Sequence, residues 1–384
     1  MSAIYKKLEE VCEILDSRRV PITAKNRKAG IYPYYGANGL QDYVAEYIFD
    51  DELVLLAEDG GNFGSKERPI AYRVSGKCWV NNHAHVLKAK PLVNVDYLCY
   101  ALMFYNTEGL VNGATRQKLT QMAMRQMVIP YRNMTEQLQI VDEINQVISL
   151  IDKRKEELSL LDQLVKSRFI ELFGDLASPD CKWDREKMIE ICKNPEDIKC
   201  GPFGTQLNKD EYVNTGVAVW EIPQINSFFS TIPTHYLTEE KAKQLESYSI
   251  KPNDIAMSRK GNVGKCAVFP STFEPGIIHS DVLRIRVDSK RVLPLFMMHQ
   301  LHYSGAVQQQ IELVSSGAIM AGINVTKLKH IFVHTPPMEL QQQFVSFVAQ
   351  TDKSKYYSQK FLILCRLAVN TYEQEWMKCQ TLNF

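Results

Sequence analysis

Two stretches of the chain carry apolar side chains at alternating intervals of three and four residues. In the first, over 141–172, eight of the ten positions on this seam are apolar, and Lys155 and Asp162 interrupt it. The second, over 344–376, is weaker but places Lys355 at the position equivalent to Lys155. A sustained heptad pattern predicts two long amphipathic helices, which we expect to pair with each other as an antiparallel coiled coil.

The order of short motifs along the chain repeats at a distance near 200 residues. At offsets of 200, 196 and 204 respectively, segment 55–64 matches 255–264, 83–87 matches 279–283, and 113–141 matches 317–345. Changes in the offset correspond to insertions and deletions in loops between preserved elements. The repeat therefore predicts a duplicated unit in which one long helix closes each copy.

Between the two seams, each copy carries short apolar runs separated by turn residues. They predict strands at 53–57, 71–74, 254–257 and 282–287, and helices at 97–105 and 295–303. The Gly-Asn-x-Gly sequences at 61–64 and 261–264 predict tight turns that need positive φ. The globular parts are thus predicted to be mixed α/β, with a hinge between the copies at 178–183.

Composition narrows the class of protein without naming a function. The 384 residues contain 45% hydrophobic and 23% charged side chains, as in soluble globular proteins, and the length suits about two domains. We expect a cytoplasmic protein, because every apolar run is far shorter than the ~20 residues of a membrane span and no signal-peptide pattern is visible. The nine cysteines form no Cys-x-x-Cys pair and are predicted to be free thiols. A net charge of +1 gives no global argument for a nucleic-acid partner.

A series of motifs runs through both copies in a fixed order. The first copy carries them at 34–39, 57–62, 81–87 and 115–119, the central helix at 164–175, and the second copy at 201–207, 254–265 and 322–337. In this order they resemble the specificity subunits of type I restriction-modification systems. The resemblance covers essentially the whole chain, and the two copies resemble different subtypes of recognition domain.

This resemblance implies a fold and a function. The fold is mixed α/β, with target-recognition domains at 1–133 and 178–337 joined by two helices, at 134–177 and 338–384, that pair antiparallel in a pseudo-two-fold repeat. Each domain would read one half of a bipartite target in double-stranded DNA. The helices would set the unread spacer and dock methyltransferase subunits.

The resemblance also implies the partners and the distribution of chemistry among them. Two methyltransferase subunits and further restriction subunits would join this chain on DNA, and no membrane partner is expected. We expect no cofactor in this chain, since S-adenosylmethionine would belong to the methyltransferase and ATP and Mg to the restriction subunit. Two alternatives stay open: a related system whose single partner both methylates and cleaves, and a repeat-built adaptor protein without a DNA role.

Three features invite a catalytic or metal-binding interpretation. Asn194-Pro195 begins like the loop of an adenine methyltransferase, but the second proline and the aromatic residue do not follow. The turn at 261–265 lacks the spacing and the hydroxyl of a phosphate loop. His83 and His85 alternate along one predicted strand and would supply half of a metal site, but we favour DNA-facing or structural roles. We therefore predict that the chain is not an enzyme and holds no metal.

Candidate DNA contacts are side chains of turns and motifs that can approach phosphates or base edges. In the first copy they are Lys25, Arg27, Lys28, Tyr34, Tyr35, Asn38, Lys66, Arg68, Asn82, His83, Arg116, Gln117 and Lys118. In the second copy they are Thr205, Gln206, Lys209, Arg259, Lys260, Asn262, Lys265, His279, Ser316 and Met320. Arg284 and Arg286 share a strand face and either contact DNA or pair with local acids.

Overall fold

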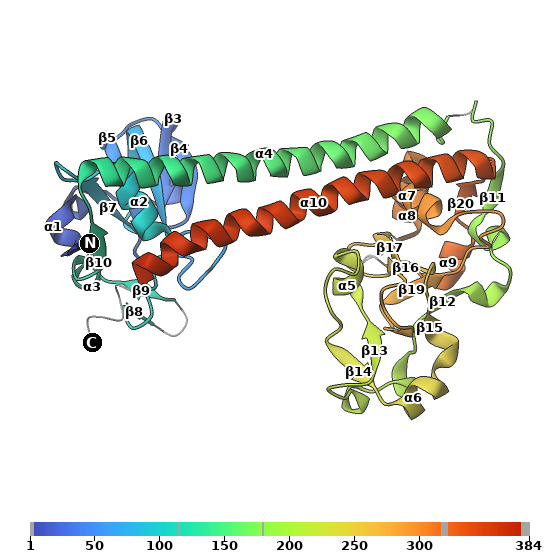
Figure 1. Ribbon diagram of the computed structural model, residues 1–384. Coiled ribbons are helices and arrows are strands. Elements are labelled where there is room, and N and C mark those ends of the chain that lie inside the picture. Colours follow the sequence, from blue (N-terminus) through green and yellow to red (C-terminus); the bar gives the residue numbers. More distant parts are fainter. Residues whose placement is uncertain (1–3, 114–115, 179, 316–321, 378–384) are drawn as a thin grey trace. The chain divides into compact units, whose positions relative to one another are not determined.

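The computed structural model describes residues 4–113, 116–178, 180–315 and 322–377. The chain divides into two compact units: unit 1 comprises 1–156 and 358–384, and unit 2 comprises 157–357. The two long helices, α4 (Met134–Phe173) and α10 (Met338–Met377), each contribute residues to both units. Figure 1 shows the elements of each unit.

Unit 1 is built on a six-stranded sheet that α2 (Val95–Met103) covers. Its order is β2 (Cys12–Ile14), β7 (Ala84–Ala89), β5 (Phe49–Ala57), β6 (Ala71–Val80), β3 (Ala29–Gly36) and β4 (Gly39–Val44). Smaller elements are the antiparallel pair β1 (Ile4–Lys7) and β10 (Val128–Tyr131), the pair β8 (Val111–Asn112) and β9 (Lys118–Leu119), and the helices α1 (Leu8–Val11) and α3 (Gln121–Arg125). All neighbours in the main sheet are antiparallel except β3 and β6, which are parallel.

Unit 2 contains two four-stranded sheets. The first has the order β12 (Ile198–Cys200), β19 (Val282–Ile285), β16 (Ile255–Ser258) and β17 (Cys266–Val268). The second has the order β14 (His235–Leu237), β13 (Val217–Trp220), β18 (Gly276–Ile278) and β15 (Ser249–Ile250). The remaining elements are the pair β11 (Arg185–Lys187) and β20 (Phe332–His334), and the helices α5 (Ile222–Asn226), α6 (Glu239–Gln244), α7 (Pro294–Tyr303), α8 (Gly305–Ser315) and α9 (Val325–Lys329).

The two units repeat one strand order. Four adjacent strands of unit 1, β2-β7-β5-β6, have their counterparts in β12-β19-β16-β17 of unit 2, and every neighbouring pair in both sets is antiparallel. In both units a helix (α2 or α7), a short helix (α3 or α9), a strand (β10 or β20) and a long helix then follow, with β8 and β9 inserted in unit 1 and α8 inserted in unit 2. The predicted mixed α/β fold is confirmed, and the units differ in what is added: β3 and β4 in unit 1, a second sheet in unit 2.

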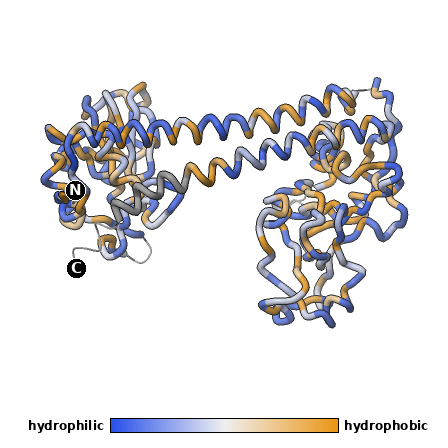
Figure 2. Tube along the Cα trace, in the orientation of Figure 1, coloured by the Kyte–Doolittle hydropathy of each residue, from blue (hydrophilic) through white to orange (hydrophobic). Residues whose placement is uncertain are grey.

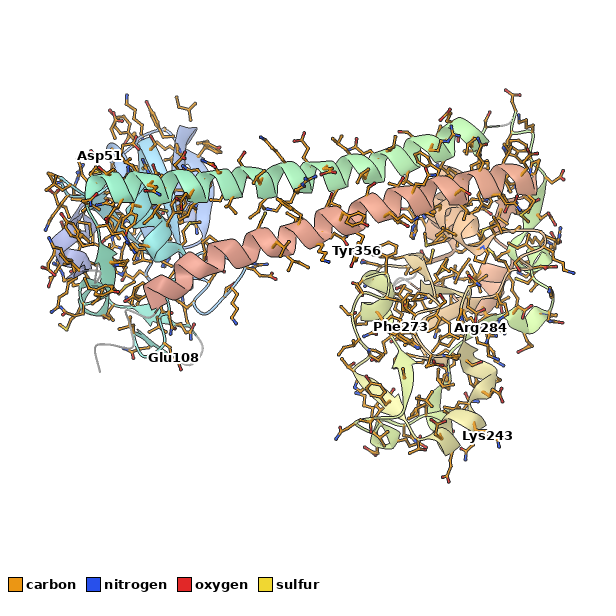
Figure 3. The ribbon with its side chains drawn as sticks, viewed as in Figure 1. Asp51, Glu108, Lys243, Phe273, Arg284 and Tyr356 are labelled. Atoms are coloured by element: carbon orange, nitrogen blue, oxygen red, sulfur yellow. The ribbon has the colours of Figure 1, made fainter. Side chains whose placement is uncertain are left out.

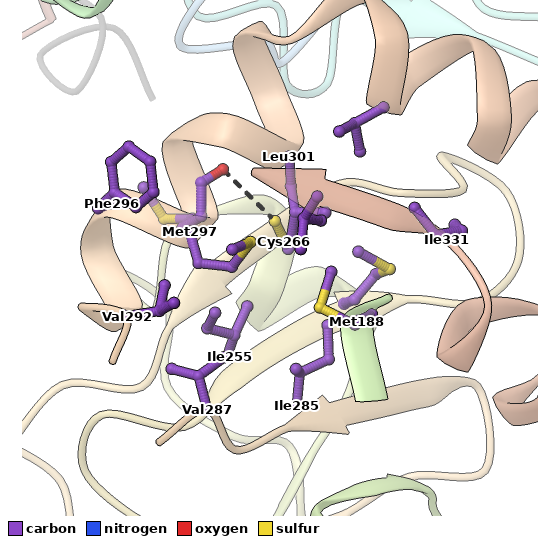
Figure 4. Close-up of a cluster of buried hydrophobic side chains, with 14 of the residues drawn as sticks. Met188, Ile255, Cys266, Ile285, Val287, Val292, Phe296, Met297, Leu301 and Ile331 are labelled. Atoms are coloured by element: carbon purple, nitrogen blue, oxygen red, sulfur yellow. Dashed lines mark hydrogen bonds between the residues drawn. The ribbon is translucent and has the colours of Figure 1, made fainter. Parts of the chain in front are cut away.

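An apolar cluster packs the first sheet of unit 2 against α7. Ile255 of β16 and Ile285 of β19 pack beneath Phe296, Met297 and Leu301 of α7 (Figure 4). Burial of apolar side chains such as these removes them from water and contributes about 1.5–3 kcal/mol each. The same cluster takes in Phe169 of α4 and Phe344 of α10, whose ring centroids lie 5.4 Å apart. The long helices are therefore part of the core of this unit rather than appendages to it.

As far as the side chains of the two helices are described, to residue 365 on α10, the predicted seams lie on the buried side of each helix. The buried seam residues are Val141, Ile144, Val165 and Phe169 on α4 and Phe344, Val348, Thr351, Ser358 and Cys365 on α10, whereas Lys155 and Asp162 are exposed. Hydrophobic and hydrophilic residues alternate along α4 and along the coloured part of α10 in Figure 2. Within unit 2, Lys355 Nζ lies 2.6 Å from Asp162 Oδ1, and within unit 1 the Arg154 guanidinium lies 5.0 Å from the Phe361 ring centroid. Gly174, at φ 75°, ends α4.

Each long helix is tied to the globular part before it by a buried glutamine in its first turn. Gln137 Oε1 accepts a hydrogen bond from the backbone N–H of Asn94 at 2.7 Å, and its Nε2 donates to the carbonyls of Leu92 and Arg132. Gln341, which stands 204 residues further on, accepts from the N–H of Leu293 at 2.8 Å. Its Nε2 donates to two more backbone carbonyls, those of Arg291 and Pro336. The duplication thus extends to this side-chain clamp.

Two predictions about cysteines and membranes have structural outcomes. The eight cysteines in the described ranges are free thiols, as predicted, and seven of them are at least partly covered by apolar core residues. Across the residues that the structure describes, every helix is too short or too polar to span a bilayer.

Candidate nucleic-acid interface

In unit 1 the segment 116–119 is held against the end of strand β5 by backbone hydrogen bonds. The N–H of Gly60 donates to the carbonyl of Gln117 at 3.2 Å, and the N–H of Leu119 donates to the carbonyl of Glu58 at 2.7 Å. Gly60 has φ 64°, a conformation that glycine adopts without strain. This pairing brings together two segments that are almost 60 residues apart in the sequence.

Side chains from four sequence motifs meet on this backbone. Asp59 Oδ1 accepts hydrogen bonds from His83 Nδ1 at 2.5 Å and from Arg116 Nη2 at 3.0 Å. Asn38 Nδ2 donates to the carbonyl of Gly60 at 2.9 Å. We call this group, with Gln117 and Lys118, the unit 1 cluster. It unites five of the predicted contacts, namely Asn38, His83, Arg116, Gln117 and Lys118.

A buried ionic network supports the unit 1 cluster. His85 Nδ1 lies 2.6 Å from Asp16 Oδ2, and its Nε2 lies 2.9 Å from the carbonyl of Leu119. Both partners offer oxygen atoms, so each ring nitrogen of His85 faces a hydrogen-bond acceptor. Glu58 pairs with Arg19 at 2.6 Å and with Lys118 at 3.0 Å. The network therefore holds the segment 116–119 in place through Lys118 and the carbonyl of Leu119.

The same network bears on the metal and structural interpretations of His85. Donor atoms of Asp16, Glu58 and His85 lie within 4.8 Å of one another, close enough to hold a metal ion. Burial acts to raise the pKa of Asp16, but hydrogen bonds from His85 and others outweigh it and hold that pKa below its usual range. Arg19 and Lys118 already supply positive charge to Glu58, which opposes a further cation. The geometry fits an ion-pair network and favours a structural role for His85.

Unit 2 gathers a comparable group at the equivalent strand ends. Lys260, just after β16, lies 2.9 Å (Nζ to Oδ1) from Asp281, just before β19. The backbone N–H of Asp281 donates to His279 Nδ1 at 3.2 Å. Arg259 donates through Nε to the carbonyl of Ile323, and its guanidinium lies 4.8 Å from the ring centroid of Phe203. We call Phe203, Arg259, Lys260, His279 and Asp281 the unit 2 cluster.

The other predicted contacts of unit 2 differ in their surroundings: some form hydrogen bonds or contact an aromatic ring, and others are exposed. Gln206 Oε1 accepts from the N–H of Phe203 and from Tyr248 Oη, both at 3.1 Å. Lys265 Nζ lies 5.6 Å from the Phe228 ring centroid. Thr205, Lys209 and Asn262 are exposed. Ser316 and Met320 lie outside the described residues.

Several predicted contacts of unit 1 stand apart from the unit 1 cluster, and one of them is wrong. Tyr34 is 1% exposed, packs with Val44 and Trp79, and is covered by the Arg27 guanidinium at 4.1 Å, so it cannot touch DNA. Arg27 also pairs with Asp42 at 3.2 Å. Tyr35 is half-buried against Tyr72. Exposed candidates without a described contact to the cluster are Lys25, Lys28, Lys66, Arg68 and Asn82.

Arg284 and Arg286 are structural in unit 2. Arg284 is buried among the side chains of the unit (Figure 3) and donates to the backbone carbonyls of Ser247, Ser249 and Glu196. It thereby links β19 of the first sheet to β15 of the second. Arg286 pairs with Asp254 through two hydrogen bonds of 2.7 Å. Pairing with a local acid, one of the two interpretations from the sequence, is observed for Arg286, whereas Arg284 binds backbone carbonyls instead.

The carboxylates of both clusters escaped sequence reasoning. Asp59 lies 57 residues from Arg116 and 24 from His83, and nothing in their spacing indicates contact. The segments with cofactor-like sequences have simpler explanations. Asn194 and Pro195 begin a short 3-10 turn closed by Asp197, and 261–265 forms the turn of the β16–β17 hairpin rather than a strand-to-helix loop.

Comparison with known proteins assigns the chain to a family. The type I restriction modification DNA specificity domain matches twice, over residues 4–160 and 196–360. A putative type I restriction enzyme specificity subunit of Haemophilus influenzae is 29% identical over 352 residues, which cover 90% of this chain and 86% of that protein. The EcoprrI specificity subunit of Escherichia coli is 29% identical over 85 residues, 22% of this chain and 20% of that one.

Solved structures agree on the fold. The type I restriction-modification S subunit from M. genitalium superposes with a TM-score of 0.57 at 13% identity, covering 97% of this chain and 95% of that one. A chain from a structure concerned with complex assembly and conformational transition of the type I restriction-modification system gives a TM-score of 0.57 at 15% identity, covering 98% and 96%. With its repeated strand order and its two domain matches, this chain belongs to the family of type I restriction-modification specificity subunits.

Proposed function

We propose that the two units read the two halves of a bipartite DNA target. The observation that carries this proposal is the equivalence of the two clusters. Each gathers a cation, an aspartate and a histidine at the same place, beyond the end of β5 or β16 and just before β7 or β19. Lysine and arginine side chains contact phosphates and base edges, and histidine and asparagine add hydrogen bonds. In this proposal the recognition domains comprise 1–133 and 178–337.

The long helices, 134–177 and 338–384, would serve as an antiparallel, pseudo-two-fold pair that sets the spacer between the half-sites. Support comes from the buried seams and from the Lys355–Asp162 ion pair. Large apolar side chains also lie off the seams, on exposed positions of the two helices: Leu150, Leu160, Leu164, Ile363 and Leu364. Exposed apolar side chains of this kind favour a protein partner, and we assign them to docking of two methyltransferase subunits.

Chemistry in this proposal is supplied by partners in cytoplasmic complexes. The methyltransferase subunits would bring S-adenosylmethionine, and the restriction subunits would bring the ATP and Mg requirement. One of the solved relatives is described in terms of complex assembly of its own restriction-modification system, which supports such partners here. This chain would contribute sequence choice and no catalytic group.

Methylome sequencing tests the proposal directly. Cells that express this chain with the methyltransferase of its own system should methylate a split target, two short sequences separated by a spacer of fixed length and free composition. Methylation that continues unchanged without this chain, or that falls on one uninterrupted sequence, would contradict it. An adaptor without a DNA role predicts no dependence on this chain. If a single partner polypeptide both methylates and cleaves, the split target remains but purified complexes lack a separate restriction subunit.

A further inference from the structure

Arg116 is exposed but held on one side. Its side chain is 61% exposed, whereas that of its partner Asp59 is only 19% exposed. Arg116 Nη2 donates to Asp59 Oδ1 at 3.0 Å, and the same oxygen accepts from His83 Nδ1 at 2.5 Å. The carboxylate is thus covered by two side chains, while the guanidinium group keeps most of its surface toward solvent.

The Arg116 guanidinium lies beside the turn at Gly60. A Cβ on Gly60 would lie 3.4 Å from Arg116 Nε and 3.6 Å from Nη2, an ordinary van der Waals contact, and it is the φ of 64° that favours glycine at this position. The carbonyl of Gly60 is itself held by Asn38. Arg116 and Asp59 also start from paired strands, because 116–119 is hydrogen-bonded to the end of β5. The contact between them therefore does not depend on two loops meeting by chance.

Folding stability does not explain why a carboxylate stands at this place. An exposed ion pair adds little to stability, and a carboxylate repels the phosphates that the unit 1 cluster is proposed to approach. The carboxylate instead restricts the rotamers of Arg116 before DNA binds. The side chain then loses less conformational entropy on binding. The contacts with Asp59 and His83 both involve Nη2, and most of the side chain stays exposed, so that further N–H groups of the guanidinium are available for O6 and N7 of guanine.

We propose that Asp59 is a positioning residue that orients Arg116 to read a guanine in the half-site recognised by unit 1. This inference rests on the DNA-recognition function proposed above. His83 fills the other side of the carboxylate, so that Asp59 has one orientation for Arg116 to follow.

The test measures base preference rather than affinity alone. The complex of the full chain with its methyltransferase subunits is titrated with duplexes that carry the target found by methylome sequencing, and with duplexes in which each base pair of the first half-site is replaced in turn. Asp59→Ala should lower the preference for one guanine about 10-fold. It should also strengthen binding to unrelated DNA, because a negative charge is removed. Asp59→Asn keeps an oxygen for Arg116 and should retain the preference within about 3-fold.

Two comparisons separate positioning from simple structural support. Arg116→Ala should abolish the same preference, and adding Asp59→Ala to it should cause no further loss. Glu52→Gln is the matched control, because it weakens another carboxylate–arginine pair, with Arg73, near the opposite end of β5. It should leave both half-sites unchanged, and all variants should keep the wild-type preference in the second half-site.

The outcomes distinguish this inference from the function on which it rests. Equal weakening on every duplex together with a lower Tm, or additive losses in the double variant, would show that Asp59 only supports the fold. A first half-site without a required guanine would likewise overturn the positioning role and leave bipartite recognition intact. Wild-type binding that ignores sequence altogether would overturn the proposed function itself.

Discussion

The unit 1 and unit 2 clusters occupy equivalent strand ends but distribute their charges differently. In unit 1 the acid, Asp59, follows the central strand β5, and the cation, Arg116, arrives from a distant segment. In unit 2 the cation, Lys260, follows the central strand β16, and the acid, Asp281, precedes β19. The shared strand order fixes where polar groups gather, while the loops decide which group stands at each place. Two half-sites of different sequence are the expected consequence.

The two equivalent histidines show the same contrast at the level of single atoms. His83 Nδ1 donates to a carboxylate, so in the neutral ring Nε2 is an acceptor. His279 Nδ1 accepts from a backbone N–H, so its Nε2 carries the proton and is a donor. Neither Nε2 has a hydrogen-bond partner within the described part of the chain. Equivalent positions thus present opposite hydrogen-bonding groups to a ligand.

Exchange of one whole recognition region is the strongest way to break this comparison. Replacing 20–130 with the matching region of a relative should change the first half-site completely and leave the second half-site and the spacer as they were. The physical reason is that the replaced residues supply the whole unit 1 cluster and none of the unit 2 cluster. Methylome sequencing of cells with the chimaera reads both halves at once. A change in both halves would refute the independence of the two units.

Insertion of four residues after Ser159 tests the role of the long helices, which belong to neither cluster. About one turn added to α4 shifts its seam by roughly 6 Å against α10. We expect a longer spacer with both half-sites unchanged, or loss of complex assembly, measured by methylome sequencing and by gel filtration. Full activity with an unaltered spacer would argue against the helices as a ruler. Substitution of Ser159 by alanine is the control and should alter neither property.

Single cation substitutions sharpen the comparison of the two clusters. Arg116→Ala should cost about 1–3 kcal/mol on the cognate duplex and relax one base position, because a bidentate contact is lost. Lys260→Ala should weaken binding to all sequences and reduce the slope of log affinity against log salt by about one, because lysine is a point charge. Fluorescence titration at several salt concentrations distinguishes the two patterns. The same pattern for both variants would show that the two clusters contact DNA in the same way.

Acid sensitivity should distinguish the cores of the two units. Burial lowers the pKa of His299 in α7 from 6.5 to about 3, while α2 of unit 1 contains no histidine. Between these pH values His299 is protonated in the unfolded chain and neutral in the folded chain. The stability of unit 2 therefore falls as pH falls below about 6.5. His302 and Lys355, which are also nearby, act in the same direction. At pH 5 the loss is about 2 kcal/mol.

The variant His299→Phe should remove most of this acid sensitivity. Phenylalanine preserves the ring packing on Tyr303 and Phe344, both with centroids 5.2 Å away. Thermal unfolding at pH 7 and pH 5 measures the effect as a smaller fall in Tm than in the wild type. The exposed His330→Gln variant is the control. An equal fall in Tm for wild type and His299→Phe would show that other groups cause the acid sensitivity.

Sequence reasoning succeeded where a physical period repeats over many residues. The heptad seams located α4 and α10, since each turn adds an independent apolar position, and the repeat located equivalent strands such as β5 and β16. It also found Arg116 and His83 as candidates, because they lie in motifs. It could not find Asp59, because pairing with Arg116 depends on a backbone register set by the whole sheet.

Tyr34 shows the opposite failure. On strand β3 successive side chains face opposite sides, and only the sheet decides which side is buried. Tyr34 faces inward onto Trp79, while its neighbour Tyr35 keeps partial exposure. The sequence of two tyrosines beside a glycine turn does not indicate which of the two faces the buried side of the sheet. Aromatic residues in such motifs are therefore weak candidates for contacts until the pairing of the strand is known.

The buried glutamines Gln137 and Gln341 have a consequence for the evolution of target choice. Each hydrogen-bonds only backbone groups of the globular part that precedes its helix. Backbone groups are common to all sequences. The hydrogen bonds of these two glutamines therefore do not depend on which side chains the preceding globular part carries. Recombination between genes that crosses over within the first turn of either helix would join a foreign recognition part to this helix. The glutamine would then form the same backbone hydrogen bonds with the new part. New specificities could then arise by shuffling, without refitting the scaffold that carries them.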